Sequence, residues 1–148
     1  MGRLPKLFRD GFRGRVIASK PTIDLASKAL PDNLNIITEE AKREGREPIF
    51  ALKDLEGVLG LAEGFDYEVP IDLGGGVRAV LHDAGHILGS TIVEIDFDSQ
   101  KIYFTGDLGN PPTPLLPYPY FPKDADYAVV ESAYGSRIHE DRSARKLI

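Results

Sequence analysis

The chain has 148 residues, the length of one ordinary domain, and its 42% apolar and 28% charged residues are typical of a globular protein. It contains no cysteine, which excludes disulfides, cysteine nucleophiles and thiolate metal sites within it, and it has no run of the roughly 18 apolar residues that a membrane span needs. The formal net charge of −5 argues against a generic nucleic-acid coat protein.

Basic residues are concentrated at the N-terminus. Residues 1–20 hold six Lys and Arg residues against one acid, so this segment carries +5 and the remainder carries −10 (12 bases against 22 acids). Such a segment either forms a solvated face or follows the phosphates of a nucleic acid. No apolar signal-peptide core follows these residues, so we expect a cytoplasmic protein.

The first helix is expected to follow one short strand. Residues 15–18 have the composition of a strand, and Pro21 and Thr22 mark the start of a helix. This helix is predicted to be short and to end near Leu30.

Two more helices are predicted in the first half of the chain. Asp32 or Asn33 is expected to cap the second one, whose apolar residues recur at helical spacing until Gly45 stops it. A third amphipathic helix is expected over residues 52–62, where leucines recur at similar spacing. Two glycines inside this stretch weaken the helical pattern.

The second half is rich in β-branched and aromatic residues and predicts strands. In chain order these strands are expected at 66–73, 77–81, 91–97, 101–105 and 127–131. The tripeptide at residues 98–100 predicts a tight hairpin between two of them. Helices followed by such a series of strands predict an α/β fold in which helices pack on a mixed β-sheet.

A proline-rich segment interrupts the strands. Residues 111–122 contain six of the eleven prolines, which forbids a helix or a central strand there. The segment is therefore either a rigid connector or a wall of a functional site.

The first of three polar clusters is HDAGHILGS, at residues 82–90. It places His82 and His86 four residues apart, a spacing that brings two imidazoles to one metal ion on a helix. Gly85 and Gly89 favour a turn instead, so the two rings need not converge. Each histidine is therefore either a ligand or a structural residue.

The other two clusters also follow predicted strands, where loops carry functional groups. FTGDLG, at residues 104–109, places Asp107 between two glycines, where a carboxylate caps a turn or ligates a metal such as zinc. ESAYG, at residues 131–135, begins with Glu131 at the end of an apolar strand, and His139 follows it. Because burying an unpaired carboxylate is costly, Glu131 either joins a polar network or lies exposed.

In this order the three clusters resemble the metallo-β-lactamase superfamily and, within it, the β-CASP nucleases that process RNA or DNA. HDAGHILGS resembles the third metal motif of that family, with His86 at the ligand position. FTGDLG resembles the fourth motif, with Asp107 at the position of the aspartate that bridges two zinc ions. ESAYG resembles motif A, with Glu131 at its acidic position and Ala133 where threonine is usual, and residues 139–142 fit the run that follows.

The resemblance extends over nearly the whole chain. It implies a partial metallo-β-lactamase-like αββα sandwich over residues 1–148, ending where the β-CASP insertion begins. GRLP at residues 2–5 resembles the stretch after the HxHxDH motif, and this sequence contains neither that motif nor motifs B and C. We therefore expect the central fragment of a longer enzyme.

The resemblance also implies the chemistry, a zinc-dependent hydrolysis of phosphodiester bonds in RNA, with single-stranded RNA favoured over DNA. His86 would complete the ligands of one zinc ion, Asp107 would bridge two, and Glu131 would orient a motif B histidine. His82 would supply at most one supporting hydrogen bond. This incomplete ligand set predicts a chain that is inactive alone, and an open sheet edge predicts homo-oligomers or association with the missing segments.

Three alternatives stay open at this stage. The first is another metallohydrolase of the superfamily, against which the motif A resemblance argues. The second is a non-catalytic subunit that retains the fold without metal. The third is a truncated gene product without an independent role.

Overall fold

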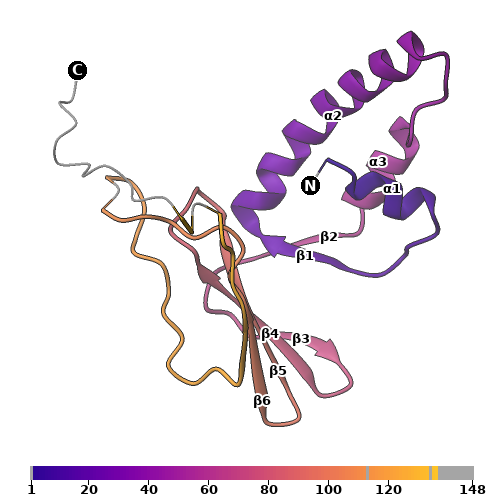
Figure 1. Ribbon diagram of the computed structural model, residues 1–148. Coiled ribbons are helices and arrows are strands. Elements are labelled where there is room, and N and C mark those ends of the chain that lie inside the picture. Colours follow the sequence, from indigo (N-terminus) through magenta and orange to yellow (C-terminus); the bar gives the residue numbers. More distant parts are fainter. Residues whose placement is uncertain (1, 113, 134, 137–148) are drawn as a thin grey trace, which may run out of the picture.

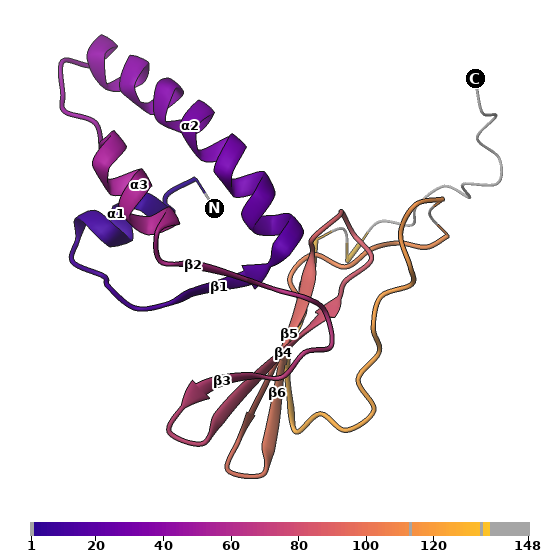
Figure 2. The same ribbon diagram turned by 180° about the vertical axis from the view of Figure 1, so that it is seen from behind.

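The computed structural model describes residues 2–112, 114–133 and 135–136. The helices are α1 (Leu4–Arg9), α2 (Lys20–Arg43) and α3 (Leu52–Leu59). The strands are β1 (Val16–Ser19), β2 (Ala62–Phe65), β3 (Ile71–Gly74), β4 (Val77–Asp83), β5 (Thr91–Phe97), β6 (Gln100–Phe104) and β7 (Tyr127–Val129). The helices gather on one side and the β3–β6 hairpins on the other, with β1 and β2 passing between them (Figures 1 and 2).

The strands form two sheets. β1 and β2 make a parallel pair, and the other sheet has the order β3-β4-β5-β6-β7. Neighbouring strands of the larger sheet are antiparallel except β6 and β7, which are parallel. This mixed sheet, combined with the helices, confirms the α/β prediction.

An apolar cluster joins the two sheets. Ile71, Ala79 and Leu81 are buried on one face of the larger sheet, and Ile17 of β1 and Phe65 of β2 pack against them. Apolar burial contributes about 25 cal/mol per Å², so this cluster stabilises the packing of one sheet on the other.

The prediction of two helices between residues 21 and 45 is wrong, because α2 is a single helix with Pro31 inside it. An internal proline costs about 3 kcal/mol through a lost hydrogen bond and a steric clash. Ala26, Leu30 and Ala41 are buried along the continuous helix, and burial of one leucine alone contributes about 1.5–3 kcal/mol. Packing on both sides of Pro31 therefore offsets its cost.

The ends of α2 follow local rules. The Ser19 hydroxyl is the N-cap and accepts a hydrogen bond from the Thr22 backbone N–H. Gly45 has a φ of 64° immediately after the C-cap, and the Arg46 N–H donates to the Ala41 carbonyl at 3.0 Å. The predicted stop at Gly45 is confirmed, since this is the glycine-terminated end that helices favour.

The third helix is shorter than predicted, because it ends at Leu59 and Ala62 already belongs to β2. Gly57, which weakened the helical pattern, has a packing reason. A Cβ there would lie 2.3 Å from the Phe8 ring, so glycine leaves the space that the Phe8 ring of α1 occupies against α3.

The hairpin between β5 and β6 is confirmed, with Asp98 and Ser99 at φ values of 50° and 63°. The prediction of one strand over 66–73 is wrong. Residues 62–65 and 71–74 form separate strands, and Glu68 lies between them with a φ of 61°, which interrupts an extended chain. In the described part of the chain, no helix combines the length and apolar character that crossing a membrane requires.

Candidate functional site

His86 lies on a turn, as the glycine pattern predicts. The turn joins β4 to β5, and its Gly85 and Gly89 have φ values of 61° and 91°. The Gly85 N–H donates to the Asp83 carboxylate at 2.7 Å, and the His86 N–H donates to the Ser90 hydroxyl at 3.2 Å. These bonds hold the backbone, and the His86 side chain is exposed.

The loop that carries Asp107 lies directly beside this turn. The Gly109 N–H donates to the Ala84 carbonyl at 2.8 Å. A Cβ at Gly109 would lie 1.8 Å from the Gly85 carbonyl oxygen, so the two backbones approach each other more closely than any other residue would allow. Asp107 is exposed, like His86. The fold therefore brings two exposed metal-type side chains onto adjoining loops from different strands.

Glu131 joins the same group of loops. Its carboxylate accepts a hydrogen bond of 2.5 Å from the Leu108 N–H, and its own N–H donates to the Thr105 hydroxyl at 3.2 Å. Of the two alternatives, the polar network is the one observed. Glu131 holds the backbone next to Asp107, so residues of the second and third polar clusters are in direct contact.

The donor chemistry of these loops fits a metal ion, but the described donors are too few to complete a site. An imidazole nitrogen and a carboxylate oxygen are both ligands that zinc accepts, and a catalytic site has three protein ligands. Within residues 2–112, 114–133 and 135–136, no group of three or more His, Asp or Glu side chains is arranged to hold a metal. His139 lies outside the described residues.

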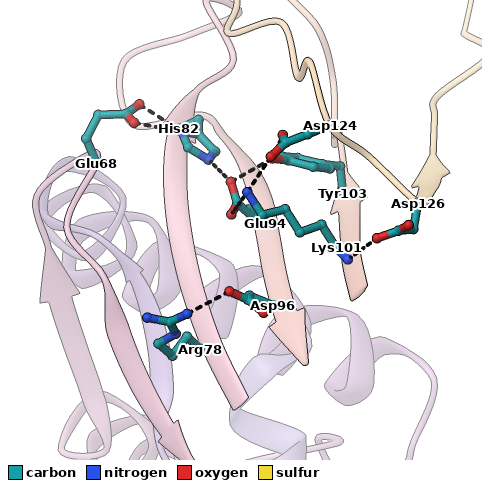
Figure 3. Close-up of polar contacts among 9 residues, drawn as sticks. All are labelled: Glu68, Arg78, His82, Glu94, Asp96, Lys101, Tyr103, Asp124 and Asp126. Atoms are coloured by element: carbon teal, nitrogen blue, oxygen red, sulfur yellow. Dashed lines mark hydrogen bonds and ion pairs between the residues drawn. The ribbon is translucent and has the colours of Figure 1, made fainter. Parts of the chain in front are cut away.

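His82 has a different environment from His86, although His82 lies in β4 and His86 lies on the turn that follows this strand. Its ring is 4% exposed and lies between two carboxylates (Figure 3). Nε2 is 2.8 Å from a Glu94 oxygen, and Nδ1 is 2.9 Å from both oxygens of Glu68. The expectation of at most one supporting hydrogen bond was therefore wrong, because His82 is the centre of a buried polar network.

Glu94 connects this network to β6. The Tyr103 hydroxyl donates to Glu94 at 2.8 Å, and the Lys101 ammonium lies 3.6 Å from its other oxygen. Burial alone would raise the pKa of Glu94, but hydrogen bonds from Tyr103 and His82 and the Lys101 charge outweigh it and lower that pKa. Burial, and after it Glu94, raises the pKa of Tyr103. Glu94 is therefore an ionised acceptor and Tyr103 a neutral donor.

Glu68, Glu94 and Tyr103 of this network were not predicted as functional residues from the sequence. A signal for Glu94 is present, since it is a charged residue in the middle of the apolar strand TIVEIDF, where an unpaired carboxylate would be costly. Nothing comparable marks Glu68, which lies in a loop 14 residues before His82.

The basic N-terminal segment is largely occupied by the fold. Five of its six basic side chains make intramolecular contacts. The partners are the Asp10 carboxylate for Lys6, the Pro48 carbonyl for Arg9, the Phe8 carbonyl for Arg13, Glu63 for Arg15 and Asp66 for Lys20. Guanidinium and ammonium groups committed in this way favour the solvated-face alternative over a path for nucleic-acid phosphates.

No family model matches the chain, but several known proteins are similar to it over most of its length. Ribonuclease TTHA0252 of Thermus thermophilus is 36% identical over 139 residues, covering 94% of this chain and 30% of that protein. The transcription termination factor FttA of Methanocaldococcus jannaschii is 33% identical, covering 91% and 21%. The endoribonuclease YSH1 of Eremothecium gossypii is 29% identical, covering 93% and 18%.

These relatives confirm the resemblance seen in the three motifs. The chain is a homologue of the β-CASP metallo-β-lactamase RNA-processing nucleases. It spans between 18% and 30% of the length of these β-CASP relatives. The metallo-β-lactamase family implies metal ions, which agrees with the donor types that His86 and Asp107 present.

Proposed function

We propose that this chain forms part of a zinc-dependent ribonuclease that hydrolyses phosphodiester bonds in single-stranded RNA. The observation that carries the proposal is the contact between Gly85 and Gly109, which brings the loops of the two exposed residues His86 and Asp107 against each other. Homology to proteins named ribonuclease and endoribonuclease supports RNA as the substrate.

In the proposed site, His86 would be a ligand of one zinc ion, and Asp107 would be a ligand shared by two. Bound zinc would supply Lewis acidity that activates water and offsets charge on the phosphate. Glu131 fixes the Asp107 loop through the Leu108 N–H, and its further role is to orient a histidine that this sequence does not contain. Both ligands are exposed, so a polymeric substrate can reach them.

The test uses the whole protein that contains this chain, supplied with zinc and an end-labelled single-stranded RNA. Asp107→Ala should reduce cleavage by more than the roughly 10–100-fold expected for a residue that only supports a ligand. His86→Ala should lower the bound zinc and the activity together, because it removes a ligand. Asp98→Asn, in the distant β5–β6 hairpin, is the matched control and should change neither.

Two outcomes would contradict the proposal. Normal zinc content and cleavage in Asp107→Ala would show that the aspartate is not a ligand. Efficient cleavage of duplex DNA, with single-stranded RNA left intact, would show that the substrate is wrong. A protein that binds no zinc and cleaves nothing would instead be the non-catalytic subunit.

Residues 1–148 alone are proposed to be inactive, because their described part holds no group of three or more His, Asp or Glu side chains that could bind a metal ion. Association with the remaining segments of the enzyme, or between copies, would complete the site. A cytoplasmic location, compatible with the absence of cysteine, is also part of the proposal and is tested by cell fractionation.

A further inference from the structure

The proline-rich segment, residues 111–122, is not explained by the proposed ligands. It leaves the Asp107 loop and runs along the outside of the sheet before β7 (Figure 1). Two of its contacts connect it to the turn that carries His86, and both involve residues near its end.

The first contact is an aromatic stack. The Tyr120 ring lies on the His82 ring with a centroid separation of 3.8 Å and an interplanar angle of 7°. The Tyr120 N–H also donates to the Asp83 carbonyl at 2.9 Å. The segment is therefore attached to the last two residues of β4 through both a side chain and the backbone.

The His82 ring is a fixed platform for this stack. Its two nitrogens are held on opposite sides, by Glu94 and by Glu68, so the ring cannot rotate without losing a hydrogen bond (Figure 3). Because Tyr103 also donates to Glu94, the carboxylate that orients His82 is itself oriented. A ring held in this way presents one face to Tyr120.

The second contact is at the turn itself. A Cβ on Gly85 would lie 2.7 Å from the Pro117 carbonyl oxygen and 3.0 Å from the Pro119 ring. Gly85 precedes His86 and is also the residue that touches Gly109. The proline-rich segment, the His86 turn and the Asp107 loop therefore meet at Gly85.

We propose that His82 is a positioning residue for His86. The His82 ring stacks on Tyr120, and this stack keeps Pro117 and Pro119 in contact with Gly85. The turn therefore holds the His86 side chain in one orientation. The part concerning metal rests on the proposed function, since His82 acts on the site through Tyr120 and the turn. Residues that orient a ligand typically change metal affinity by about 10–100-fold when they are replaced.

The test compares Tyr120→Leu with Tyr120→Phe in the whole protein that contains this chain. Tyr120→Leu removes the ring, whereas Tyr120→Phe keeps the stack on His82. Amide hydrogen exchange in the metal-free protein should become faster at residues 84–90 and at residues 118, 120 and 121 in Tyr120→Leu only. Competition with a chromophoric chelator measures the dissociation constant for zinc. This constant should rise about tenfold in Tyr120→Leu and stay at the native value in Tyr120→Phe.

Two further variants control the result. Arg78→Gln removes the ion pair between Arg78 of β4 and Asp96 of β5, the two strands that the His86 turn joins. It should change neither the hydrogen exchange nor the zinc affinity. In a His82→Gln background, Tyr120→Leu should add little, because the partner of the stack is already absent. Additive effects of the two substitutions would overturn the proposed connection.

The outcomes separate this inference from the proposed function. Faster exchange with unchanged zinc affinity, or unchanged exchange in Tyr120→Leu, would overturn the positioning role. If Asp107→Ala leaves zinc binding intact, the proposed ligand set fails. The exchange measurement needs no metal, so it still decides whether His82 holds the turn through Tyr120.

Discussion

His82 and His86 come from one strand and its turn, yet the two regions around them are built differently. Around His86, glycine contacts and hydrogen bonds donated by backbone N–H groups, some of them to side-chain oxygens, hold the loops, and the side chains of His86 and Asp107 are exposed. Around His82, side-chain hydrogen bonds hold a buried cluster. The close packing of the exposed loops depends on the absence of side chains at Gly85 and Gly109. The buried region depends instead on the hydrogen bonds that the side chains of His82, Glu94 and Tyr103 make.

Adding one methyl group should break the exposed region. Gly109→Ala would place a Cβ 1.8 Å from the Gly85 carbonyl, so the two loops must separate. We expect a loss of stability of about 3 kcal/mol or more, the upper range for overpacking, together with loss of zinc binding. Urea unfolding and zinc titration measure both effects.

Gly60→Ala is the control for that substitution. Its Cβ would meet only backbone oxygens at 3.4 Å and 3.5 Å, an ordinary contact, and Gly60 ends a helix with a φ of −66°. Stability should be unchanged or slightly higher. Equal losses in the two alanine variants would show that the contact between Gly85 and Gly109 is not what holds the loops.

Removing one charge should weaken the buried region. Glu94→Gln keeps the shape of the side chain but replaces the carboxylate that accepts from His82 and Tyr103. Hydrogen bonds to charged groups contribute about 1.5–3 kcal/mol, so we expect a loss of about 2 kcal/mol in urea unfolding.

Glu68→Gln is the matched comparison in the same network, because its side chain is 60% exposed. Water can replace its contact with His82, so the loss should be below about 1 kcal/mol. If Glu68→Gln lost more stability than Glu94→Gln, burial would not be what determines which of the two carboxylates contributes more to the free energy of unfolding.

Acid should weaken the same region through Glu94. Its pKa is lowered in the folded protein from the ordinary value of 4.5, so the unfolded chain takes up the proton first as the pH falls. The stability that Glu94 contributes is therefore fully present above that ordinary value and is lost as the pH falls through the folded pKa. Unfolding free energies measured between about pH 6 and pH 3 should fall less steeply in Glu94→Gln than in the native protein.

The smallest effect is expected at an exposed ion pair that belongs to neither region. Arg15, immediately before β1, pairs with Glu63 of β2 at 2.7 Å, and 44% and 40% of their side chains are exposed. Exposed pairs contribute about 0–1 kcal/mol and are screened by salt, so Glu63→Gln should cost less than about 1 kcal/mol. A larger loss in thermal unfolding, insensitive to salt, would place this pair among the structural contacts.

Local conformational preferences were enough to predict several elements from the sequence. The positive φ values of Asp98, Ser99 and Gly45 belong to residues that tolerate a left-handed backbone or end a helix, and no distant contact is needed to choose them. The turn at His86 was predicted in the same way, from its glycines. The three polar motifs and their order also predicted the resemblance to the β-CASP nucleases that the relatives confirm.

Packing decided what these preferences left open. α2 continues through Pro31 because Leu30 and Ala41 are buried on both sides of it, which no local pattern of a proline predicts. The contact between Gly85 and Gly109 joins positions 24 residues apart (109 minus 85), and neither glycine indicates the other in the sequence.

The two histidines show most directly which features the local sequence determines and which depend on tertiary contacts. The sequence determined their spacing, the strand and the turn, because these follow from the torsional preferences of neighbouring residues. Only the tertiary structure decided that His82 is buried between Glu68 and Glu94 while His86 faces solvent beside the Asp107 loop. The physical reason is that burial and hydrogen-bond partners depend on segments brought together by the fold, and the free energy of those contacts is absent from any local stretch of chain.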